Sequence, residues 1–398
     1  MKKINITDLS CSRRSLLKTL SALGVVTPAS VLPATSHGWL GDWFSGRHAT
    51  AEKSTGFFLS AQGDSAQRYA LSWVNQQQPH SINAGFRGHG LAQNPTRPSQ
   101  VVMFARRPGV QGLVIDAQQG QEQTRFRCAS GKHLHGHGVF SQDGQWLFTS
   151  ESDIASGRGE ICVRDTDQFK VQQVFASHGI GPHEISLLPD GKTLVVANGG
   201  LRTHPDSGRK VLNLDTMDSS LTLLNSENGT LIQQHKLANS KSSIRHLDVG
   251  QDGSVAVAIQ VQRSAMTHPH TVPLAAVLSA GASELKPLMA PEPLMIQLKD
   301  YMGSVRIHNA SQTAAFTSPK GDLVLFWHLP SGDFKGFHAF HDVCGLTLSH
   351  DQKYFVVSNS AGNIRHLSTD TLEEQKTQRM DFPAMQWDNH MITLSDRV

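Results

Sequence analysis

The apolar positions of the chain form short runs, and a recurrent Asp-Gly pair joins these runs two by two. In residues 136–150, GHGVFSQDGQWLFTS, one apolar run leads through Asp143 and Gly144 into the next. Asp and Gly suit such a connection because they tolerate the positive φ angles of a tight hairpin. The segment therefore predicts two antiparallel strands.

The same pattern returns along the chain as an internal repeat. It recurs at residues 184–197 and 246–257, and weaker copies follow at 304–316 and 345–358, the last with Asp351-Gln352 in place of Asp-Gly. Further short strands are expected between the hairpins, at 159–165 and 322–327. Four short strands in each unit of roughly 40 to 60 residues is the pattern of a β-propeller blade.

The number of blades follows from where each innermost strand begins. These positions are Arg87-Gly88-His89, His137, His183, His246, Ser304, Asp342 and His390. The last blade is composite, because residues 387–394 supply its inner strand while 57–60 and 68–74 pair outside it. The prediction is an all-β, seven-bladed propeller. Insertions at 201–220 and 266–302 leave six or eight blades as alternatives.

The first 36 residues have the layout of a signal peptide. Basic residues precede an apolar run at 20–32, and small residues follow it. The segment 12–18, SRRSLLK, resembles the twin-arginine export motif. The apolar run is too short and too interrupted for a permanent membrane span. We therefore expect residues 1–36 to be removed and residues 37–398 to form a single soluble propeller domain in the periplasm.

Charge and cysteine content narrow the possible partners and redox state. The formal charge is +3, and without residues 1–36 it becomes about −1. With no cluster of Lys and Arg, the chain lacks what nucleic-acid binding requires. An oxidising compartment would allow a disulfide between Cys128 and Cys162, which would leave Cys344 unpaired.

Histidine is the abundant residue at the predicted inner-strand starts, beside the central channel. The candidate metal ligands are His89, His137, His183, His246, His390 and Asp342, with His135, His341 and Cys344 nearby. Imidazole nitrogen suits transition metals, so iron or copper is the expected cofactor if one is bound. Arg87 and Arg245 lie beside these positions and would suit an anionic metal chelate.

A structural role for the histidines is the alternative, in which each imidazole hydrogen-bonds a neighbouring blade. The spacing gives one reason for it. His183 lies seven residues before the Asp of its turn, whereas His137 and His246 lie six residues before theirs. A slip of one residue turns a strand side chain to the other face.

Other polar segments carry weaker signals. The loop at 198–217 begins with Asn-Gly-Gly and is rich in polar residues, so it either holds function or only shapes the connection. Glu151 and Asp153 are expected to be exposed loop carboxylates, with metal ligation as the alternative. No phosphate-binding glycine loop, nucleophile elbow or zinc motif is present, so no catalytic residue is assigned and enzymatic activity has no positive support.

Several segments together resemble a family of twin-arginine-exported periplasmic propellers of unknown function. They are residues 135–138 (HGHG), 179–184 (GIGPHE), 196–200 (VANGG), 203–205 (THP), 243–247 (SIRHL) and 387–390 (WDNH). Leu201 departs from the pattern, where Ile is expected. Members are usually encoded beside imelysin-type iron-uptake proteins and a di-haem redox protein. The resemblance implies a role in periplasmic iron or other metal handling, and it supplies no catalytic residue.

Three classes of function remain open at this point. The first is a binding protein that holds a metal or an anionic metal chelate at the channel. The second is a scaffold that docks an imelysin-type or di-haem partner. The third is a metal-dependent hydrolase or lactonase, which would favour Glu, Asn and Asp ligands where this chain has His.

Overall fold

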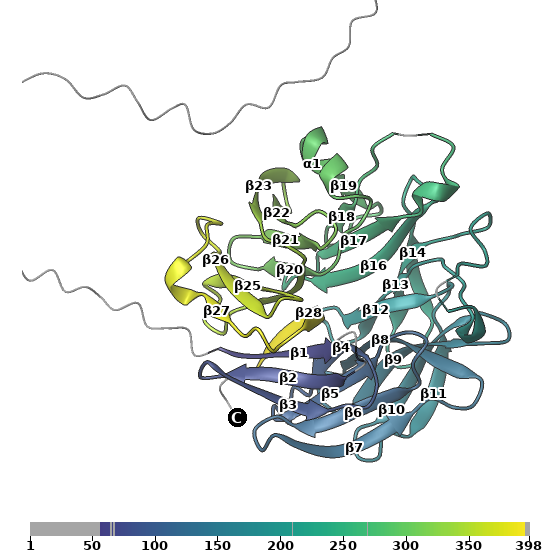
Figure 1. Cartoon of the computed structure of the whole chain (residues 1–398). Coiled ribbons are helices and arrows are strands. Elements are labelled where there is room, and N and C mark those ends of the chain that lie inside the picture. The colour runs from purple at the N-terminus through teal and green to yellow at the C-terminus, as the bar shows by residue number, and fades with distance from the viewer. Residues whose placement is uncertain (1–55, 64–65, 67, 209, 269, 395–398) are drawn as a thin grey trace, which may run out of the picture. The chain divides into compact units, whose positions relative to one another are not determined.

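The structure is a computed structural model in which residues 56–394, except 64, 65, 67, 209 and 269, are described. They form seven four-stranded antiparallel sheets, arranged as blades around a central channel (Figure 1). The predicted all-β, seven-bladed propeller is confirmed. The predicted export signal and the domain boundary at residue 36 lie outside the described residues.

In six blades the strands run outward from the channel in chain order. The first blade contains β4 (Gly88–Gln93), β5 (Gln100–Ala105), β6 (Gln111–Asp116) and β7 (Gln121–Arg127). The second contains β8 (Lys132–Phe140), β9 (Trp146–Asp153), β10 (Gly159–Asp165) and β11 (Val171–Ala176). The third contains β12 (Pro182–Leu187), β13 (Thr193–Asn198), β14 (Ser220–Asn225) and β15 (Leu231–His235). The fourth contains β16 (Ser242–Val249), β17 (Val255–Val261), β18 (Ala275–Leu278) and β19 (Lys286–Leu288). The fifth contains β20 (Val305–His308), β21 (Thr313–Ser318), β22 (Leu323–His328) and β23 (Asp333–Ala339). The sixth contains β24 (Val343–Leu348), β25 (Tyr354–Asn359), β26 (Asn363–Ser368) and β27 (Met380–Asp381).

The seventh blade joins the two ends of the described chain. Its order is β28 (Trp387–Leu394), β1 (Phe57–Gly63), β2 (Tyr69–Asn75) and β3 (Gln78–Asn83). Phe57 pairs with Leu394, and the Ser60 hydroxyl donates to the His390 carbonyl at 2.5 Å. The predicted composite blade is therefore confirmed, and its hydrogen bonds close the ring.

The Asp residues of the repeat stabilise the turns between first and second strands. In each turn a carboxylate oxygen accepts the backbone N–H two residues on, as from Asp190 to Lys192 at 2.8 Å. The others are Asp143 with Gln145, Asp252 with Ser254 and Asp351 with Lys353. Gln352 adopts a φ of 60° where the other copies have Gly, which explains how the variant copy keeps the turn.

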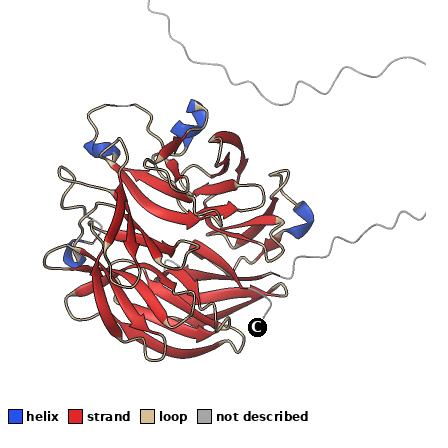
Figure 2. Ribbon diagram, turned by 180° about the vertical axis from the view of Figure 1, so that it is seen from behind, coloured by secondary structure: helices blue, strands red, loops and turns tan. Residues whose placement is uncertain are grey.

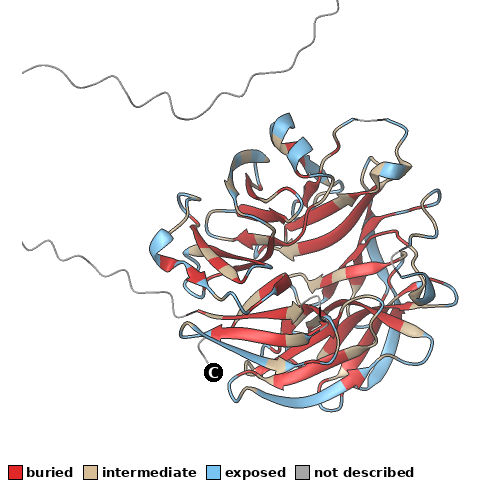
Figure 3. Cartoon of the chain, in the orientation of Figure 1, coloured by how far each residue is buried: buried red, intermediate tan, exposed pale blue. Residues whose placement is uncertain are grey.

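The core lies between the blades, since each sheet packs against a neighbour on both faces. Every residue of β5 is buried, as expected for a strand covered on both sides, whereas β7, β11 and β15 at the rim are largely exposed (Figure 3). Trp327, fully buried in β22, donates its indole N–H to the Met289 carbonyl at 3.0 Å. This hydrogen bond joins β22 to the residue after β19 in the preceding blade.

Helical segments are short and lie in the connections (Figure 2). They are the 3₁₀ turns η1 (Pro205–Ser207), η2 (Arg263–Ala265) and η3 (Lys376–Gln378) and the helix α1 (Glu292–Gln297). Within the described ranges, no helix has the length and apolar character needed to cross a membrane. The insertions at 201–220 and 266–302 hold η1 and, in the second case, β18, β19 and α1, so they lengthen two blades without adding another.

Candidate metal centre

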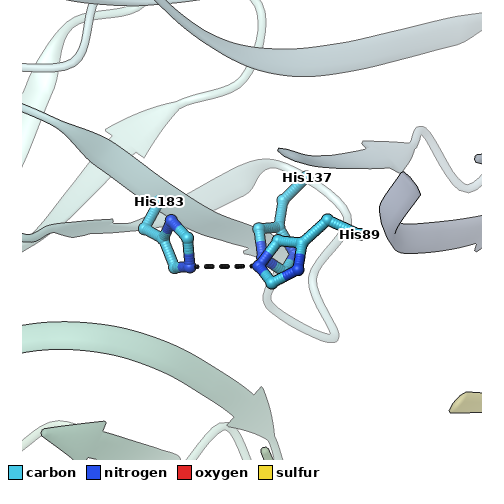
Figure 4. A group of neighbouring side chains, drawn as sticks. All are labelled: His89, His137 and His183. Carbon is cyan, nitrogen blue, oxygen red and sulfur yellow. Dashed lines mark hydrogen bonds between the residues drawn. The ribbon is translucent and has the colours of Figure 1, made fainter. Parts of the chain in front are cut away.

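Five of the seven inner strands each place one histidine in a single cluster at the channel. The members of this histidine cluster are His89 on β4, His137 on β8, His183 on β12, His246 on β16 and His390 on β28. Neighbouring ring centroids lie 4.5 to 5.9 Å apart, and no member is more than 8% exposed. Figure 4 shows three of the rings, with Nε2 of His89 and Nε2 of His183 3.4 Å apart. All five histidines predicted at the channel are brought together.

β-Bulges explain how rings with different sequence spacing reach the same point. The pairing of inner with second strand shifts register beside four of the cluster histidines, at Gly88/Leu91, Leu134/Gly138, Pro182/Ile185 and Ile244/His246. A bulge inserts an extra residue into one strand and so redirects the side chains near it. The one-residue slip at His183 therefore does not turn its ring away from the channel.

Glu184 orients two of the rings from one side. Its Oε2 accepts the backbone N–H of Leu247 at 3.0 Å and lies 3.1 Å from Nδ1 of His246. Its Oε1 lies 3.6 Å from Nδ1 of His137. A carboxylate facing Nδ1 favours the tautomer that carries its proton there, which leaves the Nε2 lone pair of His246 available to a metal.

Ser304 orients the ring of His390 in the same way. Its hydroxyl donates its one proton to the Asn389 carbonyl at 2.7 Å, so the oxygen can only accept from Nδ1 of His390, 3.2 Å away. The Nε2 lone pair of His390 is then directed elsewhere. The pairing with Ser304 partly fulfils the structural alternative, but it accounts for only one of the two ring nitrogens.

Three buried ring nitrogens of the cluster have no hydrogen-bond partner among the described protein atoms. They are Nδ1 of His89, Nε2 of His137 and Nε2 of His390. Buried polar atoms are normally paired within the protein, with water or with an ion. The cluster therefore has the free donor atoms that a metal would require.

The cluster histidines are held in the neutral state. Burial is the largest cause and lowers the pKa of all five imidazoles well below the usual value of 6.5. Next, His390 lowers the pKa of His89, and Arg245 lowers those of His183 and His246, whereas Glu184 raises that of His137. Neutral imidazole is the form that binds metal ions.

The geometry contains three overlapping sets of possible ligand atoms. They are His89 with His137 and His183, His89 with His246 and His390, and His137 with Glu184 and His246, and within each set the ligand atoms lie within 4.8 Å of one another. Nitrogen-rich sets of this kind suit Fe, Cu, Zn or Ni. The residues present therefore fit a transition-metal ion.

The other predicted site residues lie differently. Arg245 belongs to the site, with its Nη2 3.3 Å from Nδ1 of His183. Arg87 is half exposed and pairs with Asp388 at 2.9 Å. Asp342 is outside the cluster, because its backbone has a φ of 48° at the turn before β24 and its carboxylate accepts from the Ser360 hydroxyl.

Cys344 and His341 also lie apart from the cluster. The buried Cys344 thiol donates to the Asp388 carbonyl at 3.3 Å, and burial raises its pKa. His341 is exposed and pairs with Asp322 at 3.1 Å. Among the described residues the three cysteines, including Cys128 and Cys162, are free thiols, so the disulfide considered from the sequence is not formed.

The expectation of an exposed Glu151 is wrong. Its carboxylate is fully buried within β9 and pairs with the equally buried Arg164 of β10 at 2.6 Å. Asp153 does lie at the surface, where it accepts the Ser156 N–H at 2.7 Å in a turn. Glu151 thus forms a structural ion pair with Arg164 between two strands of one blade.

Sequence reasoning missed several residues of the site. A cavity of about 210 Å³ adjoins the cluster, and its lining includes His135, which the sequence had indicated. The lining residues that were not predicted include Arg106, Arg107, Gln260, Gln262, Tyr301 and Asn389. Most of these follow the second strand of a blade or precede the first strand of the next. The Arg106-Arg107 pair directly after β5 was the signal available for this end of the channel.

Acid should destabilise the protein through the histidine cluster. In the unfolded chain these histidines bind protons below about pH 6.5, whereas in the folded chain their pKa is lowered by burial. The contribution of the cluster to the free energy of unfolding is therefore complete above about pH 6.5. It falls as the pH drops toward the lowered pKa values, by up to about 1.4 kcal/mol per pH unit for each proton bound only on unfolding. Urea unfolding at pH 7.5 and 5.5 measures this.

Two buried carboxyls oppose that trend. Burial raises the pKa of Glu184 and Asp248, so their contribution is lost as the pH rises above their ordinary values of 4.5 and 3.8. A His89→Gln variant should show a shallower dependence than the wild type. An equal pH dependence in the wild type and in folded His89→Gln would contradict the neutral, buried state of the cluster.

Fold and site together define a class of protein, a seven-bladed β-propeller whose channel holds a cluster of five neutral histidines. The chain belongs to a family described as a protein of unknown function (DUF1513), which matches residues 82–394. This agrees with the resemblance to a propeller family of unknown function. No curated protein matches the chain.

A similar solved structure is hydrazine synthase from Kuenenia stuttgartiensis. The sequences are 14% identical, the TM-score is 0.59, and the match covers 83% of this chain and 100% of the other. Identity this low shows a shared fold alone.

Proposed function

We propose that this protein binds a transition-metal ion, bare or as an anionic chelate, in the histidine cluster and serves periplasmic acquisition of iron or another such metal. The observation that carries the proposal is the convergence of five neutral imidazoles from five separate blades, three of them with a buried nitrogen that lacks a partner among the described protein atoms. No catalytic residue is part of the proposal.

The hydrogen bonds around the cluster favour metal binding over a purely structural role. In metal sites the second ring nitrogen of a ligand histidine usually donates to a carboxylate or another acceptor. Glu184 provides this for His246, and Ser304 provides it for His390. A structural cluster would be expected to pair both nitrogens of each ring with protein groups.

The cellular setting of the proposal rests on the sequence. The twin-arginine-like segment 12–18 supports export to the periplasm. The family resemblance supports cooperation with an imelysin-type or di-haem redox protein. Metal delivered by or to such a partner would pass through the cavity that adjoins the cluster.

A scaffold that docks such a partner is the second candidate function. It is favoured by aliphatic side chains exposed on the rim strands β11 and β15, namely Val171, Val174, Leu231 and Ile232, which are 38 to 50% exposed. Each of the two strands thus carries a pair of exposed apolar side chains, and exposed apolar surface is what a docking partner would cover. This candidate needs no metal in the cluster.

Metal analysis of natively purified protein separates the two candidates. We expect about one iron or copper ion per chain, removable by a chelator and restored by dialysis. Reloading should raise the free energy of unfolding by about 2.7 kcal/mol when free metal is at one hundred times its dissociation constant. Protein that is isolated without metal and takes none up would contradict metal binding and favour the scaffold function.

A further inference from the structure

The cavity beside the histidine cluster is large enough for a small ligand. Its volume of about 210 Å³ equals that of roughly seven liquid water molecules. Four imidazoles form part of its wall, those of His89, His135, His183 and His246. A ligand in this cavity would therefore touch the candidate metal centre directly.

The lining of the cavity is positively charged. It includes the guanidinium groups of Arg106, Arg107 and Arg245, and no Asp or Glu is among its described lining residues. Asp388, outside the lining, lies 3.3 Å from Nη1 of Arg106 and offsets part of that charge. Arg245 is only 7% exposed, so its charge acts in a poorly solvated place. Burial and, after it, the charge of Arg245 lower the pKa of His183.

The Asn-Gly-Gly segment leaves room for the Arg245 guanidinium. A Cβ atom at Gly199 would lie 3.0 Å from Nη1 of Arg245 and 2.9 Å from the hydroxyl of Ser243. Ser243 in turn donates to the Gly199 carbonyl at 2.7 Å. A side chain at this position would therefore push against the guanidinium and the hydroxyl, which gives the polar loop a role in shaping the cavity.

Neutral groups at the cavity complement its charge. Gln260, Gln262, Asn389 and Tyr301 offer amide and hydroxyl donors. His135 is 2% exposed, its Nε2 lies 2.7 Å from the Ser152 hydroxyl, and its Nδ1 has no hydrogen-bond partner among the described protein atoms. The cavity thus combines three cations with a buried imidazole nitrogen that a ligand would satisfy.

We infer that this cavity binds a small anion of two or more negative charges that carries carboxylate or phosphate oxygens. Guanidinium groups recognise such oxygens through paired, charge-assisted hydrogen bonds. The volume restricts the ligand to the size of a small polycarboxylate or a phosphate. The inference rests on the proposed function for the role of the anion, as the companion of a bound metal, but binding of the anion needs no metal.

Calorimetry on metal-free protein, prepared with chelator and then desalted, tests the inference. Citrate, inorganic phosphate and acetate are titrated separately at low ionic strength. We expect one citrate or one phosphate per chain, and acetate roughly tenfold weaker or worse, because it brings a single charge to three guanidinium groups. The stronger of the first two identifies the preferred oxyanion.

Three variants assign the binding to the cavity. Arg245→Gln should weaken binding on the order of 10- to 100-fold, the loss of a hydrogen bond to a charged group. Gly199→Ala keeps every charge but displaces the guanidinium, so it should weaken binding in the same direction and provides a second test if Arg245→Gln folds poorly. Arg379→Gln, outside the cavity lining and paired with Glu374 at 2.6 Å, is the matched control and should bind as the wild type does.

Two results would overturn the inference. One is the absence of citrate and phosphate binding by the folded, metal-free protein, and the other is binding that both cavity variants leave unchanged. Metal content of the same preparations before stripping is measured in parallel. Metal retained without anion binding defeats only this inference, whereas anion binding without any metal uptake defeats only the proposed function.

Discussion

An Arg164→Met variant is expected to lose about 3 to 5 kcal/mol of the free energy of unfolding. The guanidinium of Arg164 is 1% exposed and lies 2.6 Å from the fully buried carboxylate of Glu151. It also donates to the Phe169 carbonyl at 3.1 Å and lies over the Phe126 ring, 4.6 Å from the centroid. Methionine fills much of the volume but leaves the Glu151 charge buried and uncompensated.

Urea unfolding measures this loss, and two further variants assign its cause. Replacing both partners, Arg164→Met with Glu151→Leu, should recover most of the stability because no charge then remains buried. Lys236→Met removes an exposed pair with Asp218 at 2.8 Å and should cost no more than about 1 kcal/mol. If Arg164→Met behaved like Lys236→Met, the buried pair would not have the role described here.

Variants of the metal centre should lose metal affinity in a graded way. Glu184→Gln keeps an oxygen that can accept from Leu247 but removes the negative charge facing Nδ1 of His246, so affinity should fall on the order of 10- to 100-fold. His246→Ala removes a ligand and should cost more. Competition with a chromophoric chelator at pH 7.5 measures both values.

A buried histidine outside the cluster provides the control for these two variants. His308 of β20 is 6% exposed, and its Nδ1 lies 2.7 Å from the Ser311 hydroxyl. His308→Ala should keep the wild-type affinity even if it lowers stability. Unchanged affinity in folded Glu184→Gln and His246→Ala would show that the metal, if bound, lies elsewhere.

The fold was predictable because its signals are local. Asp190 and Gly191 stabilise their hairpin through contacts within a few residues, so the sequence alone marks the turn. Repetition of the same turn then identified the inner strands, and the remaining terminal strands could only complete the last blade. The alternation of apolar and polar positions added little to the prediction, because strands such as β5 are buried on both faces.

The candidate site was predictable only in part, because it depends on long-range geometry. The inner-strand position of His183 was visible, but the β-bulge that directs its ring depends on pairing with β13. Asp342 shares the sequence position of the histidines, yet its turn conformation keeps its carboxylate away from them. Glu151 appeared to be a loop carboxylate because nothing local reveals its pairing with Arg164.

X-ray absorption spectroscopy of the metal-loaded wild-type protein reports the atoms that bind the metal. We expect a first coordination shell with at least three nitrogen atoms at about 2.0 to 2.1 Å, together with the outer-shell pattern of imidazole rings. A shell without imidazole, or one with sulfur at about 2.3 Å from the free cysteines, would contradict a metal centre in the histidine cluster.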